Sequence, residues 1–338
     1  MVPLVLIMLL MHLVEQIACQ GSIAFPIDKR EGDPCLLSSG RTGQCRTASA
    51  CSSTDTGELV LCRSNGRQVV VCCDVVQQEC NAVNVAVKKF AEHVVGVADK
   101  ASVGEFPFIG LVMFNNSNKF CGASIISDRF LLTAAHCFVE NNATSVRLGT
   151  IDANDDMADT IPIANIYRHP RYARSRRLND IALIELERRI VMNSNVKPVC
   201  LYAENEELLE TQNLTVAGWG IDNSDDVSTV LLKGIVRTVP RNDCQKRLDG
   251  FSNIRRLNVT DGHLCALGDL NEEGKATDAC QGDSGGPLVM RRDDRYYLVG
   301  VVSSGFGCGS ANLAGLYTWV AKYVGWIVER GVWRFSSV

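Results

Sequence analysis

The sequence predicts an all-β protein with a small disulfide-linked module near its N-terminus and a helix near its C-terminus. From residue 106 onward, short runs of β-branched and aromatic residues recur between turn residues, a spacing typical of an all-β sandwich or barrel. Six of the 15 cysteines lie between positions 35 and 73, a stretch of 39 residues. Val320, Val324, Ile327 and Val328 fall at helical spacing and predict a terminal helix around residues 320–330.

Length, charge and cysteine usage exclude several classes of protein. The 338 residues fit one domain of about 240 residues and a small one. The net charge of −4 lacks the basic footprint of a nucleic-acid binder, so no nucleic-acid partner is expected. The cysteines lack the paired spacings of a zinc site, which favours disulfides in an oxidising compartment. Neither a metal nor another cofactor is expected.

The first residues predict a secretory signal peptide, residues 1–20. Residues 2–14 form an apolar run too short for a membrane span, and small residues follow it. A membrane anchor is the alternative interpretation. Removal of Cys19 would leave 14 of the 15 cysteines, an even number that permits full pairing. No other window reaches the length of a membrane span, so a secreted, extracellular protein with no membrane partner is expected. Candidate N-glycosylation sequons stand at Asn115, Asn142, Asn213 and Asn258.

The cysteine-rich segment 35–73 holds too few apolar residues to build a core, so disulfides must stabilise it. Sequence alone does not choose the pairing, although the adjacent Cys72 and Cys73 are expected to have different partners. A generic disulfide knot is one interpretation. The order of the six cysteines, ending in Cys72-Cys73-Asp74, resembles the clip domain of arthropod extracellular serine proteases. This resemblance implies the pairs Cys35–Cys72, Cys45–Cys62 and Cys51–Cys73. Residues 74–93 are expected to form a linker.

Expected strands in the β-rich body are those with the strongest runs of β-branched and aromatic residues, at 108–114, 129–133, 182–187, 214–219, 296–302 and 315–320. Near the end of this body, Gln281-Gly282-Asp283-Ser284-Gly285-Gly286-Pro287 predicts a glycine-rich loop that presents a serine nucleophile. A serine hydroxyl needs an adjacent base and a third group to orient that base. His136, in Thr133-Ala134-Ala135-His136-Cys137, is the candidate base, and Asp180, flanked by apolar residues, is the candidate orienting carboxylate.

These motifs, together with Gly218-Trp219-Gly220, stand in the order found in the chymotrypsin-like serine proteases, which residues 94–331 resemble. The resemblance implies two six-stranded antiparallel barrels with the active site in the cleft between them. It implies that Ser284 attacks the scissile carbonyl, that His136 transfers the proton and that Asp180 orients the imidazole. The backbone N–H groups of Gly282 and Ser284 would form the oxyanion hole. The implied disulfides are Cys121–Cys137, Cys244–Cys265, Cys280–Cys308 and Cys80–Cys200, the last of which would keep the N-terminal module attached after activation.

The same resemblance places Asp278 at the floor of the primary specificity pocket, where a carboxylate selects an Arg or Lys side chain. Gly305 and Gly315 match the walls of that pocket and leave it open to a long side chain. One position departs from the family pattern, because Ser304 stands where an aromatic residue is usual. That change removes an apolar wall beside the residue N-terminal to the cleavage point.

The resemblance also implies a switch, in which cleavage frees an apolar N-terminus whose ammonium pairs with Asp283. Val94-Val95-Gly96-Val97 matches that N-terminus, so the cut is expected between His93 and Val94, although Val97 replaces the common second glycine. Because His93 is not basic, a trypsin-like enzyme is not expected to make this cut, and autoactivation is not expected. A non-basic residue here resembles the mid-cascade subfamily of clip proteases.

The leading hypothesis is therefore a secreted trypsin-like endopeptidase zymogen in an extracellular cascade of innate immunity (melanisation or Toll activation) or developmental patterning. Its partners would be an upstream activating protease, a downstream protease zymogen and an inhibiting serpin. A non-catalytic clip-domain cofactor is one alternative, which the complete His136, Asp180 and Ser284 set disfavours. A digestive or venom trypsin is another, which the N-terminal module disfavours.

Two charged segments fit either a site or a solvated surface. A basic run just before Asp180 would suit an acidic partner or a polyanion, and an acidic loop would suit weak Ca²⁺ binding, but solvated loops are the favoured interpretation of both. The basic residues are Arg171, Arg174, Arg176 and Arg177, and the acidic ones are Asp152, Asp155, Asp156 and Asp159.

Overall fold

The fold is taken from a computed structural model. It describes residues 29–51, 60–64, 69–82, 99–115, 120–140, 142–204, 208, 212–221, 226–250, 257–270, 274, 276–277, 279–305, 310 and 312–333. Four of the sequence predictions lie outside these residues, namely the signal peptide, the His93–Val94 cleavage site, Asp278 and Cys308. Within the described residues, no helix has the length and apolar character needed to cross a membrane.

The N-terminal module is a four-stranded antiparallel sheet in the order β1-β2-β4-β3, followed by a short helix. Alternate residues of β4 face in opposite directions, so that Val70 and Cys72 pack inside the module while Val71 and Cys73 join the core of the larger domain. The module therefore has two packed faces. Its elements are β1 Pro34–Leu36, β2 Thr42–Thr47, a 3₁₀ turn Ala48–Ala50, β3 Leu61–Ser64, β4 Val69–Cys73 and α2 Val75–Ala82.

The first barrel closes through six antiparallel strands in the order β10-β11-β8-β7-β6-β9. Its interior is filled by side chains such as Leu111, Leu132 and Ile184, all of which are fully buried. The barrel is thus a packed core rather than a pore. Its strands are β6 Ile109–Phe114, β7 Phe120–Ile125, β8 Phe130–Thr133, β9 Ala143–Leu148, β10 Asp159–Arg168 and β11 Ala182–Leu186.

The second barrel runs β17-β16-β13-β14-β15-β18 and closes by the pairing of β18 with β17. Two short strands extend its sheet, since β12 pairs with β17 in parallel and β5 pairs with β14. The predicted architecture of two six-stranded antiparallel barrels is therefore confirmed. The elements are β5 Asp99–Lys100, β12 Cys200–Leu201, β13 Asn213–Gly218, β14 Leu232–Val239, α3 Arg241–Asp249, β15 His263–Gly268, β16 Pro287–Arg292, β17 Arg295–Ser304 and β18 Gly315–Trp319.

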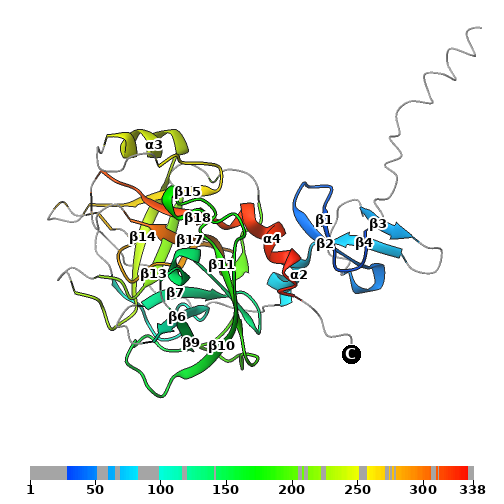
Figure 1. Ribbon diagram of the computed structural model, residues 1–338, viewed down its shortest axis with the longest axis horizontal. Helices are drawn as coiled ribbons and strands as arrows, with labels where there is room; N and C mark the ends of the chain where they lie inside the picture. The colour runs from blue at the N-terminus through cyan, green and yellow to red at the C-terminus, as the bar shows by residue number, and fades with distance from the viewer. Residues whose placement is uncertain are drawn as a thin grey trace, which may run out of the picture.

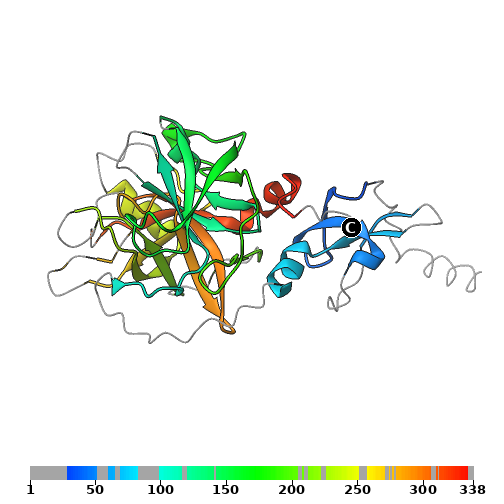
Figure 2. The ribbon, with the colours of Figure 1, turned by 90° about the horizontal axis from the view of Figure 1, so that it is seen from below.

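The C-terminal helix is also confirmed, but it begins as a 3₁₀ turn, Val320–Tyr323, and becomes α-helical only in α4, Val324–Glu329. In both ribbon views α4 lies between the barrels and the N-terminal sheet, with α2 beside it (Figure 1 and Figure 2). Nη2 of Arg46 on β2 donates to the carbonyl oxygen of Trp333 at 2.9 Å. The N-terminal module is therefore packed on the C-terminal segment of the larger domain, in addition to any covalent link.

Candidate active site

The histidine and the aspartate expected to act together lie in direct contact. His136 sits in a 3₁₀ turn, Ala135–Phe138, that follows β8, and Asp180 precedes β11, which pairs with β8. Nδ1 of His136 lies 2.7 Å from Oδ2 of Asp180, and the backbone N–H of His136 donates to Oδ1 at 2.9 Å. The carboxylate thereby fixes the imidazole with its proton on Nδ1, which leaves Nε2 as the free basic atom.

Two residues of the second barrel also donate hydrogen bonds to Asp180. Oγ of Ser303, on β17, donates to Oδ2 of Asp180 at 2.6 Å, and Oγ1 of Thr318, on β18, donates to its backbone carbonyl at 2.7 Å. Burial would raise the pKa of Asp180, but the hydrogen bond and charge of His136, together with the hydrogen bond of Ser303, lower it below the usual value. Asp180 is thus ionised, although its side chain is fully buried.

Ser284 lies where the two barrels meet. Its carbonyl oxygen accepts a hydrogen bond from the N–H of Gly122 on β7 at 2.8 Å, and Sγ of Cys137 lies 3.9 Å from that oxygen. Cys137 directly follows His136, so this contact brings the serine loop beside the histidine turn. Gly285 has φ of 76°, and a Cβ there would lie 2.2 Å from Oγ1 of Thr133, so only glycine fits this close approach.

Gly282 and Ser284 are the residues whose backbone N–H groups are expected to form the oxyanion hole. Neither the N–H of Gly282 nor that of Ser284 donates to another residue in the described part of the chain. Gly282 has φ of 102°, a conformation that a side chain would strain. This absence of partners among the described residues is compatible with the expected role of both N–H groups in an oxyanion hole.

Asp283 is buried without a cationic partner among the described residues. Its Oδ1 accepts from the N–H of Gly220 and its Oδ2 from the N–H of Cys280, both at 2.8 Å. Burial raises the pKa of Asp283 to about 6, although these two hydrogen bonds oppose the shift. Gly218 and Gly220 make room for the carboxylate, since a Cβ at either position would lie within 2.3 Å of one of its oxygens. The site is suited to receive a positive charge.

Two residues expected to form the walls of the specificity pocket, Gly305 and Gly315, lie within the described part of the chain. Gly305 follows β17 and Gly315 begins β18, which pair with each other at Ser304 and Leu316. An added Cβ at Gly305 would lie 3.0 Å from the carbonyl oxygen of Ala279, so a larger residue would narrow the space. The position of Asp278 itself lies outside the described residues.

The structure joins the cysteines in the pairs that the family resemblance implies, as far as the described residues extend. Cys280 is also disulfide-bonded, but Cys308 lies outside them. The pairs are Cys35–Cys72, Cys45–Cys62, Cys51–Cys73, Cys80–Cys200, Cys121–Cys137 and Cys244–Cys265.

The remaining candidate residues lie on the surface. All four sequon asparagines, Asn115, Asn142, Asn213 and Asn258, are exposed, as glycan attachment requires. In the acidic loop, Asp156 pairs with Arg147 and Asp159 with Arg188. Asp152 and Asp155 accept backbone N–H groups of their own turns. These contacts favour the interpretation of a solvated loop over a Ca²⁺ site.

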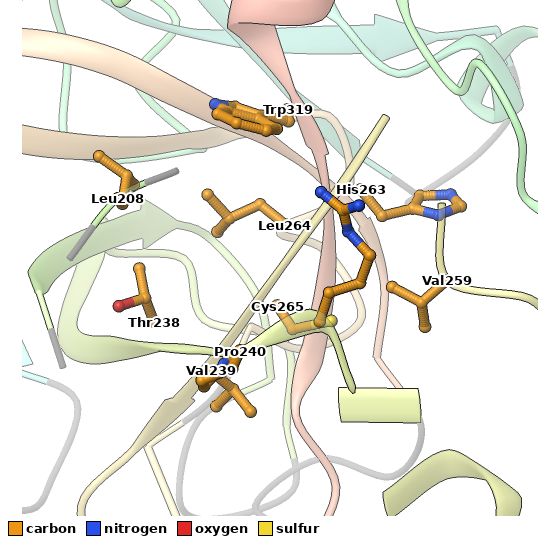
Figure 3. A pocket seen from close by; sticks show the side chains of 10 residues that line it. Leu208, Thr238, Val239, Pro240, Val259, His263, Leu264, Cys265 and Trp319 are labelled. Carbon is orange, nitrogen blue, oxygen red and sulfur yellow. The ribbon is translucent and has the colours of Figure 1, made fainter. Parts of the chain in front are cut away.

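A pocket on the second barrel lies apart from the triad, between β14, α3, β15 and β18 (Figure 3). Apolar side chains dominate its lining, among them Leu208, Val259, Leu264 and Trp319. Its lining also includes the buried His263, whose ring points away from Leu208 and Leu264 (Figure 3). No lining residue belongs to the triad, so this pocket is not the active site.

One comparison with known proteins matches residues 95–327, and another covers nearly the whole chain. The Trypsin family matches residues 95–327. A CLIP domain-containing serine protease C9 of Anopheles gambiae is 34% identical over 345 residues, covering 96% of this chain and 92% of that protein. A phenoloxidase-activating factor 1 of Holotrichia diomphalia is 36% identical over 249 residues, covering 66% of each chain. The serine protease Hayan of Drosophila melanogaster is 33% identical over 269 residues, covering 75% of this chain and 41% of that protein.

Proposed function

The chain belongs to the clip-domain serine proteases, and from this premise we propose that it is a secreted zymogen that cleaves proteins after Arg or Lys once it is cut between His93 and Val94. It is a serine endopeptidase that takes part in a proteolytic cascade. The proposed organisation is a signal peptide at 1–20, a clip domain at 35–73, a linker at 74–93 and a protease domain at 94–331. Secretion is supported by its disulfides and by its exposed sequons.

In the proposed mechanism, Ser284 attacks the scissile carbonyl while Nε2 of His136 takes the hydroxyl proton and then gives it to the leaving amine. Asp180 stabilises the imidazolium that forms, which its 2.7 Å contact with Nδ1 allows. The N–H groups of Gly282 and Ser284 bind the oxyanion, an interaction worth about 10²–10³ in kcat for each donor. Water then releases the acyl group by the same proton relay in reverse.

The observation that carries the proposal of a zymogen is the buried carboxylate of Asp283, which has two backbone donors and no cation among the described residues. A buried charge of this kind is unfavourable until it is paired. Cleavage before Val94 creates an apolar N-terminus with a new ammonium group, which would supply the pair and order the loop around Ser284. Because His93 precedes the cut, the activating protease must accept a residue other than Arg or Lys before the scissile bond.

The proposed cascade is one of innate immunity, either melanisation or Toll activation, or one of developmental patterning. Two relatives are named for phenoloxidase activation and melanization, which supports the first of these. The partners would be an upstream protease, a downstream protease zymogen cut after Arg or Lys, and a serpin. A non-catalytic clip cofactor does not fit a chain that retains His136, Asp180 and Ser284.

The test uses the full chain with the residues just before Val94 replaced by the recognition site of a protease that leaves Val94 as the new N-terminus. The cut protein is expected to hydrolyse peptides with Arg or Lys, but not Phe, before the scissile bond, and Ser284→Ala should remove the activity. Cleavage after Phe and not after Arg would contradict the assignment of Asp278 to the floor of the specificity pocket. N-terminal sequencing of the naturally activated protein checks the position of the cut. A new N-terminus other than Val94 would contradict cleavage between His93 and Val94.

A further inference from the structure

The basic segment just before Asp180 is held in a fixed position beside the catalytic residues. We call residues 171–178 the arginine loop. Ala173 and Leu178 pair across the base of the loop, and the side-chain amide of Asn179 donates to the carbonyl oxygen of Arg171 at 2.7 Å. Arg177 has φ of 55°, a left-handed conformation that is unfavourable for an arginine and needs support from its surroundings.

The second barrel gives that support. Nε2 of His263, on β15, lies 2.9 Å from the carbonyl oxygen of Arg177, and Nδ1 accepts the N–H of Thr260 at 3.0 Å. With Nδ1 accepting, Nε2 carries the proton and donates to Arg177. His263 pairs with Thr318 across β15 and β18, and Thr318 in turn binds the carbonyl oxygen of Asp180. One edge of the second barrel therefore fixes both Arg177 and the catalytic aspartate.

The loop carries positive charge that the described residues neutralise only at Arg174. Arg174 pairs with Glu140 at 2.6 Å, but none of the described carboxylates lies within ion-pair distance of Arg171, Arg176 or Arg177. Arg176 is exposed and Arg177 is partly exposed. These side chains thus keep their guanidinium groups available to a ligand.

The small side chain of Ser304 leaves the surface around this residue open. Ser303 reaches inward to Asp180, and Ser304, the next residue on β17, is partly exposed. The register of β17 against β18 shifts between Val302 and Ser304, and pairing resumes at Ser304 with Leu316. The family resemblance places this residue beside the substrate segment N-terminal to the scissile bond. A small hydroxyl there stands where an aromatic wall is usual, and Asp180, which the adjacent Ser303 binds, directly follows the arginine loop and Asn179 in the chain.

We propose that Arg177 and Arg176 form a subsite for an acidic side chain of the substrate, within the few residues that precede the cleaved Arg or Lys. Guanidinium groups bind carboxylates through paired, charge-assisted hydrogen bonds, which makes arginine suited to this task. The inference rests on the proposed function and adds to it a class of substrate, a segment with an acidic residue shortly before a basic one. His263 is then a positioning residue for this subsite.

The experiment compares fluorogenic peptides that end in Arg and carry either Glu or Gln at one of the three preceding positions. The activated full-length enzyme is expected to prefer Glu at one of these positions by roughly fivefold in kcat/KM, with a smaller preference at high salt. Arg177→Gln, or Arg176→Gln together with it, should abolish the preference, and Arg177→Lys should retain part of it. Arg188→Gln removes a distant surface arginine and should leave the preference intact.

Equal kcat/KM for Glu and Gln at all three positions would overturn the subsite, as would a preference that survives in the double Gln variant. Failure to cleave either the Glu or the Gln peptides would instead contradict the proposed specificity for Arg. In that case the subsite is tested by binding of the same peptides to Ser284→Ala, where tighter binding of the Glu peptide supports it and equal binding overturns it.

Discussion

Oγ of Ser303 donates a hydrogen bond to Oδ2 of Asp180 at 2.6 Å, and the same oxygen lies 2.7 Å from Nδ1 of His136. Ser303 belongs to the second barrel, whereas Asp180 and His136 belong to the first. The hydrogen bond therefore links the two barrels at the carboxylate proposed to orient His136. It lowers the pKa of Asp180 against the effect of burial, alongside the larger contribution of His136.

Ser303→Ala is expected to lower kcat by about ten- to a hundredfold, because hydrogen bonds to charged groups contribute about 1.5–3 kcal/mol. KM should change little, since Ser303 does not contact the substrate. Steady-state kinetics on an Arg peptide measure both constants. Ser194→Ala, which alters an exposed serine in a turn, is the matched control. A change confined to KM would argue against a role for Ser303 through Asp180.

Asp283→Asn tests the buried carboxylate that we propose as the activation switch, through the pH dependence of the stability of the uncut chain. The pKa of Asp283 is raised to about 6 in the folded chain, so the folded state binds this proton more tightly than the unfolded state does. Its contribution to stability is present at low pH and is lost as pH rises through about 6. Between about pH 4.5 and pH 7.5, the uncut wild type should therefore lose roughly 2 kcal/mol relative to Asp283→Asn.

The measurement is the free energy of unfolding in urea for both proteins at the two pH values. The difference between them isolates Asp283 from the other titrating groups. Activation should oppose the loss, because a new ammonium group beside the carboxylate favours its charged form. Identical pH dependence in the wild type and the Asn variant would contradict the burial of an ionisable Asp283.

Strongly patterned elements were predictable from the sequence, and their ends differ from the structure by at most two residues. Residues 182–187, for example, form β11 at Ala182–Leu186, because a mostly buried strand gives a run of apolar residues that only Glu185 interrupts. β10, Asp159–Arg168, gave no such signal, since most of its side chains are at least partly exposed and its register shifts between Ile163 and Asn165. Its strand conformation depends on pairing with β9 and β11.

The residues of the candidate site were likewise predictable from the sequence only in part. His136, Asp180 and Ser284 were identifiable because each stands in a long motif. Ser303, Thr318 and His263 were not, because each is one polar residue in a strand whose partner lies more than 80 positions away along the chain. Their signal in the structure is a buried polar group with a long-range partner. That pairing depends on how the two barrels pack, which no local pattern encodes.

Replacement of both Cys80 and Cys200 by serine tests the attachment of the clip domain. After the chain is cut before Val94, the wild-type fragments should migrate together in a non-reducing denaturing gel, because Cys80–Cys200 joins them. The double variant should separate into two fragments. In a native gel it should remain assembled, since Val71, Val75 and Val76 pack into the core of the protease domain and Arg46 binds Trp333. Separation under native conditions would show that this packing does not suffice without the disulfide.

Ser304→Trp tests the missing wall of the substrate cleft. An indole at this position would cover an apolar side chain of the substrate, and burial of about 50 Å² of apolar surface gives roughly a tenfold gain in kcat/KM. Peptides with Val before the terminal Arg should show this gain over peptides with Ser at that position. Ser304→Ala separates the effect of size from loss of the hydroxyl, and the gain should be absent there. A Trp variant that gains nothing on apolar peptides would place Ser304 away from the substrate.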